Sequence, residues 1–169
     1  ARQEGKGPPF AQALVHHERT GLAGLSRSLV ALESLKEDAQ SVIKGNGTLM
    51  DDPGYKAKIA ELEIDLMASE YTELRCLASA SAGAELGPES SILKLKGTGI
   101  QQRIQKLNTE ASGIYSPAWG DQSVGLPFAK SGTAGYLASR AYTIYGGASE
   151  VQRDVIAKNV LGLTKSSTK

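Results

Sequence analysis

The sequence has very few of the residues that build metal sites and disulfides. Cys76 is the only cysteine among 169 residues, so the chain cannot close an internal disulfide or hold a cysteine-based metal cluster. Its two histidines, His16 and His17, are adjacent and cannot point to the same side of a helix. No set of Cys, His and acidic residues has the spacing of zinc ligands, so we assign no metal site. This composition fits a reducing cytoplasm.

An excess of charge of one sign is also missing. The chain carries 19 basic and 18 acidic residues, a formal net charge of +1, and the two signs are interspersed. Composition therefore gives no general reason to expect nucleic acid or an anionic membrane surface as a partner. No apolar run is long enough to span a bilayer, and residues 1–9 lack the apolar core of a signal peptide. We expect a soluble protein without membrane insertion.

The sequence does have a helical spacing of apolar residues. They recur at intervals of three and four, whereas no useful stretch alternates with a period of two, so helices are predicted and strands are not. The predicted helices cover about residues 10–44, 53–82, 89–112, 128–145 and 149–161. Long helices joined by short Gly/Pro turns favour an all-α fold, an up-and-down four-helix bundle with an additional C-terminal helix packed across one end.

The same spacing predicts which side of each helix is buried. The stripe of the first helix is expected to include Leu25, Leu29, Leu32, Ala39 and Ile43. That of the second helix is expected to run through Ile59, Leu62, Leu66, Met67, Tyr71, Leu74 and Ala78. In the fourth helix, Leu137 and Ile144 are expected to point inward.

Turn residues mark the expected helix ends and the domain limits. Gly45 to Gly47 end the first helix, Asp52 and Pro53 begin the second, and Gly113 ends the third. The length suits one domain with a sizeable core. We interpret residues 1–9 as a linker remnant, 10–163 as the helical domain and 164–169 as a flexible tail.

The corner before the last helix is the most distinctive local pattern. Gly146 and Gly147 permit a sharp turn, and Ser149 with Gln152 has the Ser-x-x-Gln form of a capping box. The N-terminus of the helix would present free amide N–H groups and the positive end of the helix dipole, which suit phosphate or another anion. The alternative is a plain corner between two helices.

Glu18 is the sharpest single candidate for chemistry. It lies between Leu14 and Leu22 on the apolar seam of the first helix, so its carboxyl would be desolvated, which raises its pKa and makes it a better base near neutral pH. The alternative is that Glu18 lies near a helix start and merely ends the buried stripe.

Other charged residues have a simpler interpretation. Glu150 by itself is most simply a solvated acid in a first helical turn. Four cations of the third helix could bind phosphate or nucleic acid, but an exposed helix face is favoured for them: Lys94, Lys96, Arg103 and Lys106.

Residues 144–163, IYGGASEVQRDVIAKNVLGL, resemble the closing motif of acyl-CoA dehydrogenases, Tyr-(Glu or Gly)-Gly-(Thr/Ser/Ala)-x-(Glu/Gln)-(Ile/Val)-Gln-Arg-x-x-Ile-Ala. The segments 60–64, 71–75 and 91–98 resemble the bacterial branch typified by the pimeloyl-CoA dehydrogenase large subunit. With residues 18–24, the resemblance covers nearly the whole chain.

The resemblance implies an FAD-dependent enzyme that desaturates an acyl-CoA thioester at Cα–Cβ and passes the electrons to electron-transfer flavoprotein. Such enzymes have an N-terminal helical domain, a middle β-domain and a C-terminal helical bundle, and only the last is represented here. We therefore expect a C-terminal domain of a bacterial cytoplasmic protein that is inactive alone. Relatives assemble as dimers or tetramers, which implies a homo- or hetero-oligomer.

The resemblance also implies catalytic residues. Most members carry the base, a glutamate, between the Tyr and Gly of the closing motif, where this sequence has Gly146. A minority place it before the arginine of the first long helix, which corresponds to Glu18 before Arg19. Glu18 is thus implied as the base, and the Gly146 amide as the donor to the thioester carbonyl.

By the same resemblance, FAD is contacted from the positions of Ala148 and Glu150. The segment from Glu110 to Gly113 matches one that packs against the adenosine end of FAD in a neighbouring subunit. Two alternatives stay open: a non-catalytic partner subunit of a hetero-oligomeric dehydrogenase, and a helical interaction module. The sequence does not specify acyl chain length or a preference for dicarboxylyl groups.

Overall fold

The computed structural model describes residues 24–83, 87–117 and 125–163 of the chain. The α-helices in these ranges are α2 (Leu25–Ser41), α3 (Pro53–Ser81), α4 (Glu89–Ser112), α5 (Ala129–Ser139) and α6 (Ser149–Asn159). Single 3-10 turns lie at η1 (Leu49–Asp51), η2 (Gly113–Tyr115) and η3 (Arg140–Thr143). Two-residue strands β1 (Ile43–Lys44) and β2 (Gly47–Thr48) pair antiparallel, with Ile43 opposite Thr48.

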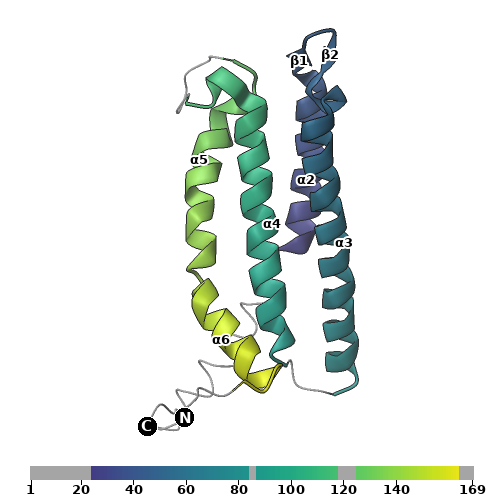
Figure 1. Cartoon of the computed structure of the whole chain (residues 1–169), viewed down its shortest axis with the longest axis vertical. Helices are drawn as coiled ribbons and strands as arrows, with labels where there is room; N and C mark the ends of the chain where they lie inside the picture. Colours follow the sequence, from purple (N-terminus) through teal and green to yellow (C-terminus); the bar gives the residue numbers. More distant parts are fainter. Residues whose placement is uncertain (1–23, 84–86, 118–124, 164–169) are drawn as a thin grey trace, which may run out of the picture.

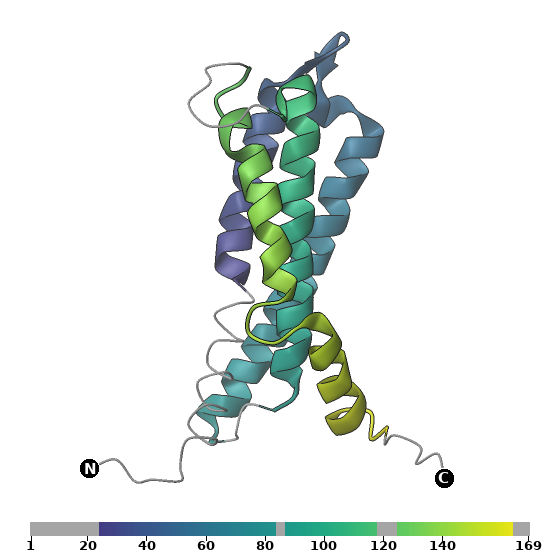
Figure 2. The same cartoon turned by 90° about the vertical axis from the view of Figure 1, so that its left-hand side faces the viewer.

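The helices α2 to α5 stand side by side and alternate in direction, with α4 at the centre (Figures 1 and 2). Helix α6 packs against the N-terminal part of α4, at the end of the bundle away from the β1–β2 hairpin. The predicted all-α fold, an up-and-down bundle with an additional C-terminal helix, is confirmed. None of the helices in the described ranges combines the length and the apolar character needed to cross a membrane.

The core lies where α2, α3 and α4 face one another. Its fully buried side chains come from all three helices: Leu32, Leu35 and Ala39; Ile59, Leu62 and Leu66; Leu93, Ile100 and Ile104. Tyr55 adds a polar link, since its hydroxyl donates to the carbonyl of Leu107 at 3.1 Å. Burial raises the pKa of Tyr55, and the negative charges of Glu110 and Asp38 act in the same direction, so the hydroxyl remains a donor.

The corner between α2 and α3 confirms one predicted boundary and corrects another. Asp52 caps α3 by accepting from the Tyr55 amide at 2.8 Å, and Pro53 occupies the first turn, as expected. The first helix, however, ends at Ser41 rather than near Lys44, because the chain turns there into the β1–β2 hairpin. A hairpin of two-residue strands is too short to leave an alternating pattern in the sequence.

Several positions predicted to be inward are exposed. On α3, Met67, Tyr71, Leu74 and Ala78 are exposed, and all four follow Leu66 in the C-terminal half of the helix. Leu29 and Ile43 are exposed in the first helical region, and Leu137 and Ile144 near the fourth helix. The fourth helix also ends earlier than predicted, because it tightens into η3 after Ser139.

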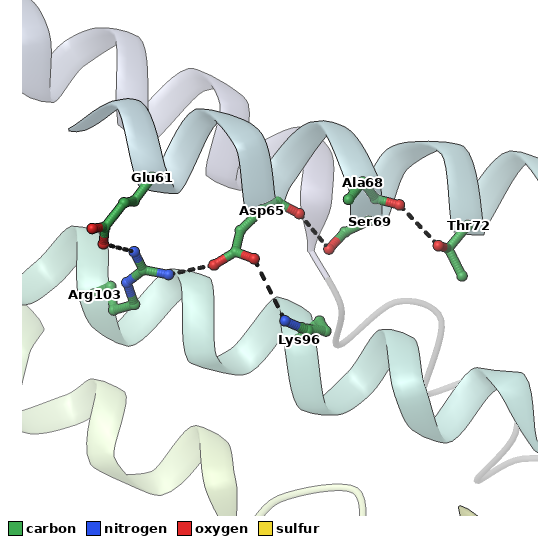
Figure 3. A network of polar contacts seen from close by, with 7 residues as sticks. All are labelled: Glu61, Asp65, Ala68, Ser69, Thr72, Lys96 and Arg103. Atoms are coloured by element: carbon green, nitrogen blue, oxygen red, sulfur yellow. Dashed lines mark hydrogen bonds and ion pairs between the residues drawn. The ribbon is translucent and has the colours of Figure 1, made fainter. Parts of the chain in front are cut away.

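A polar bridge ties α3 to α4 outside the core (Figure 3). Arg103 contacts Asp65 at 2.5 Å and Glu61 at 3.2 Å, and Lys96 reaches Asp65 at 3.5 Å. Burial raises the pKa of Asp65, but the hydrogen bond from Arg103 and the charges of Lys96 and Arg103 outweigh it, so the net pKa is lowered. The carboxylate therefore stays ionised and pairs the two helices.

Two leucines of α3 provide a matched test of this core. Leu66 is 1% exposed and Leu74 is 54% exposed on the same helix. Leu66→Ala should lower the free energy of unfolding by about 2–5 kcal/mol, because it leaves a cavity in the core. Leu74→Ala should change it by about 0.5 kcal/mol or less. Urea titrations followed by circular dichroism measure both, and equal midpoints for the two variants would contradict the described packing.

The Asp65 bridge predicts a pH dependence. Because the folded-state pKa of Asp65 is lowered, its contribution is present above the unfolded value and lost as the pH falls through the folded value. Asp65→Asn should therefore reduce stability at pH 7, by at most about 1 kcal/mol for such a partly exposed pair, and the deficit should shrink as the pH falls through the acid range. Asp154→Asn, at an exposed position of α6, is the control. An Asp65→Asn deficit that does not shrink as the pH is lowered would refute the ionic origin.

Candidate functional site

The turn between η3 and α6 contains two glycines that both adopt left-handed backbone conformations. Gly146 has φ 62° and Gly147 has φ 99°, values that side-chain-bearing residues rarely adopt. A Cβ on Gly147 would also collide with the side-chain amide nitrogen of Gln152. The positive φ thus favours glycine at 147, and a side chain there would also require the buried Gln152 side chain to shift.

Both carbonyls of this turn are held by buried side chains. Lys94 Nζ, from α4, donates to the carbonyl oxygen of Gly147 at 2.8 Å. Gln152 Nε2, from α6, donates to the carbonyl oxygen of Gly146 at 3.2 Å. Lys94 and Gln152 are each 0% exposed, whereas the two glycines are half-buried, so the donor side chains are shielded from water. We call this arrangement of Lys94, Gln152 and the two glycines the carbonyl clamp.

The carbonyl clamp leaves the amide N–H groups of the turn pointing elsewhere. In a planar trans peptide the N–H points opposite to the C=O, so the amides of Gly147 and Ala148 point away from Gln152 and Lys94. Among the described residues none accepts a hydrogen bond from the amides of Gly146, Gly147 or Ala148. These donors join the free amides of the first turn of α6, which is where an anion or a carbonyl oxygen binds well.

The predicted capping box is wrong in its details. The N-cap residue is Ala148, not Ser149, and Ser149 already lies inside the helix. Its hydroxyl donates to the carbonyl of Thr143 at 3.4 Å, and Gln152 turns back to Gly146. Helix α6 begins one residue earlier than the Ser-x-x-Gln pattern assumes. The side chains of Ser149 and Gln152 therefore stabilise the turn rather than the helix end.

Lys94 is the residue that sequence reasoning missed. It was expected on an exposed face with Lys96, Arg103 and Lys106, but it is fully buried, whereas Lys96 and Lys106 are exposed. A signal does exist in retrospect. Small side chains precede and follow Lys94 by about one turn, on the buried side of α4, and they leave space for a long side chain: Ser90, Ser91, Gly97 and Thr98.

The other predicted site residues lie in two groups, one near the N-terminal part of α4 and one at its C-terminal end. Half-buried Ala148 and exposed Glu150 adjoin the Gly146 turn, and Arg153 lies 3.9 Å from the Glu150 carboxylate. Glu110 and Gly113 lie at the far end, where Glu110 pairs with Lys58 at 2.7 Å and a Cβ on Gly113 would meet no atom within 4 Å. Sixteen residues of helix separate Lys94 from Glu110, about 24 Å.

Glu18, the predicted base, lies outside the described residues, so its proximity to Gly146 stays a prediction.

A groove of about 430 Å³ opens beside the turn, between α4 and α6. Its aliphatic side chains are Ile92, Leu95 and Ile156, and its cations are Lys96 and Arg153. Within the described ranges, no three Cys, His, Asp or Glu residues cluster as metal ligands would. The polar groups that this end of the bundle offers to a ligand are therefore backbone N–H donors, with the cations Lys96 and Arg153 nearby.

Comparison with known families gives a match over most of the chain. Residues 5–161 match the model described as acyl-CoA dehydrogenase, C-terminal domain. A search of curated proteins gave no significant match.

Solved structures with the same fold are numerous and distant in sequence. Butyryl-CoA dehydrogenase from Megasphaera elsdenii is 20% identical with a TM-score of 0.75, covering 94% of this chain and 40% of that one. A glutaryl-coenzyme A dehydrogenase complexed with glutaryl-CoA is 16% identical with a TM-score of 0.77, covering 99% and 41%. A chain of the ChsE4-ChsE5 complex from Mycobacterium tuberculosis is 24% identical with a TM-score of 0.78, and the match covers 97% of this chain and 42% of that one. The chain thus spans about two fifths of the length of these structures.

The carbonyl clamp can be tested with a pair of glycine substitutions. Gly45→Ala, at φ 61° in open space, should cost about 1–2 kcal/mol from backbone strain alone. Gly147→Ala adds the collision with Gln152 and should cost clearly more. Chemical denaturation of both variants measures the difference. If the two variants lose the same stability, the close approach of Gln152 to Gly147 is incorrect.

Proposed function

Since this chain belongs to the family of acyl-CoA dehydrogenase C-terminal domains, we propose that it forms the helical wall of an FAD-dependent enzyme. The proposed reaction introduces a double bond between Cα and Cβ of an acyl-CoA thioester. The observation that carries this proposal is the Gly146–Gly147 turn, whose carbonyls are tied into the bundle while its amides have no acceptor among the described residues.

The Gly146 amide is proposed to donate to the thioester carbonyl oxygen. Removal of the α-proton places enolate-like negative charge on that oxygen, and a fixed N–H stabilises the charge as it develops. Gly146 also has no side chain to occupy the space in which most family members carry their base. The helix dipole of α6, with its positive end at this turn, acts in the same direction.

The base is proposed to be Glu18, in keeping with the minority pattern of the family. Removal of the α-proton requires a base. Among the described residues at the turn, the carboxylate on offer is Glu150, whose side chain is 82% exposed and lies beside Arg153. A solvated carboxylate is a poorer base for an α-proton than a desolvated one.

The residues at the turn fit FAD as a cofactor. Backbone donors at positions 146–148 and the N-terminal turn of α6 suit the carbonyl, hydroxyl and phosphate oxygens of a flavin dinucleotide, although the Glu150 carboxylate would repel a phosphate placed directly against it. Ala148 and Glu150 would hold it in this subunit, and Glu110 with Gly113 would contact it in a neighbouring one. The chemistry that bound FAD supplies is acceptance of a hydride from the β-carbon.

The separation of the two residue groups along α4 supports the proposal that one bundle contacts two cofactors. Glu110 and Gly113 lie too far from Gly146 to contact the same flavin ring, but they can reach a second subunit's cofactor. We therefore propose an oligomer in which each bundle serves two cofactors, with electron-transfer flavoprotein as the electron acceptor.

The decisive experiment is an anaerobic titration of the full-length flavoprotein with acyl-CoA thioesters. The flavin absorbance should bleach as the thioester is desaturated. Glu18→Gln should reduce the rate of bleaching by about 10²- to 10⁴-fold with FAD retained, whereas Glu37→Gln, exposed on α2, should leave it unchanged.

Two results would favour the alternatives. An unchanged rate in Glu18→Gln, or no bleaching although FAD is bound, favours a non-catalytic partner subunit. Tight assembly that depends on neither flavin nor CoA favours a helical interaction module.

A further inference from the structure

We propose that Lys94 and Gln152 are positioning residues that aim the Gly146 amide at its acceptor by fixing the carbonyls of the glycine turn. This inference rests on the proposed function and adds to it two residues that contact neither the thioester nor the flavin. Lys94 acts from α4 and Gln152 from α6, so the turn is fixed to two helices at once.

The geometry shows how the aim is set. The peptide that carries the Gly146 N–H joins Tyr145 to Gly146, and both neighbouring peptides are fixed. On one side the Tyr145 amide donates to Ala141 at 3.0 Å; on the other the Gly146 carbonyl accepts from Gln152 at 3.2 Å. The peptide after that accepts from Lys94 at 2.8 Å. Because two glycines otherwise have wide conformational freedom, these bonds decide where the donor points.

The burial of Lys94 and Gln152 is unfavourable for stability, which supports a functional role for both residues. A buried ammonium group is costly to desolvate, and an aliphatic side chain of the same length would avoid that cost. Gln152 Oε1 is also buried with no hydrogen-bond partner among the described residues, which is unfavourable for a core position. Both residues form a charged or polar contact with the one turn that carries the proposed donor.

A preorganised donor is also what the chemistry needs. A hydrogen bond to a developing oxyanion is effective only if the donor is already in place, and a misplacement of about 1 Å can reduce the rate on the order of 100-fold. Gly146 cannot supply this rigidity itself. The buried donors of α4 and α6 supply it instead.

The test uses the full-length flavoprotein and two readouts. Lys94→Met removes the ammonium group and keeps the length of the side chain; Lys106→Met, exposed on α4, is the matched control. The first readout is the infrared stretching frequency of a ¹³C-labelled thioester carbonyl in bound butyryl-CoA, which falls when an N–H donates to it. The second is the split between kcat and KM.

In Lys94→Met the carbonyl frequency should move back toward that of the free thioester, and kcat should fall about 10- to 100-fold with KM nearly unchanged. Lys106→Met should match the parent in both. A parent-like frequency and kcat in Lys94→Met would overturn the inference. If Lys94→Met does not fold with FAD, Gln152→Met decides in the same way, and a parent-like result there also overturns it.

Failure of the proposed function has a different signature. In that case the parent protein shows no downshift of the thioester carbonyl and no bleaching, before any substitution is made. A parent that polarises the carbonyl and desaturates the thioester, together with a Lys94→Met variant that does both equally well, rejects only the positioning role.

Discussion

The hydrogen bond from the buried Lys94 ammonium group to the carbonyl of Gly147 is the contact on which the end of the bundle depends. It connects the central helix α4 to a turn that has no rigidity of its own, since both residues of the turn are glycines. Once that carbonyl is fixed, Gln152 can reach Gly146 and α6 can start against α4. This link therefore joins the start of α6 to the central helix.

The architecture was largely predictable from the sequence because it depends on spacing. Apolar residues at intervals of three and four predicted α4 with its observed limits, and Asp52 with Pro53 predicted the start of α3. The errors arose where a property depends on neighbours distant in the chain. Met67, Tyr71 and Leu74 continue the helical stripe of α3, yet they are exposed. Spacing specifies a face, not whether another helix covers it.

The site was predictable only in part, for a related reason. The glycine turn and the helix after it were evident from residues 146–152, whereas the burial of Lys94 depends on a contact across 53 positions of sequence. Charge suggested exposure, and only the small residues around Lys94 suggested otherwise. Ser149 and Gln152 were noticed for a capping role, but they stabilise the turn instead.

The length of α4 has a mechanical consequence. One end of this helix holds the glycine turn and the other carries Glu110, about 24 Å away along a continuous helix. A tilt of about 5° around the Lys94 end would move Glu110 by roughly 2 Å, more than a hydrogen bond tolerates. The continuous helix therefore acts as a lever, because a small rotation at the glycine turn becomes a displacement of Glu110 larger than a hydrogen bond tolerates.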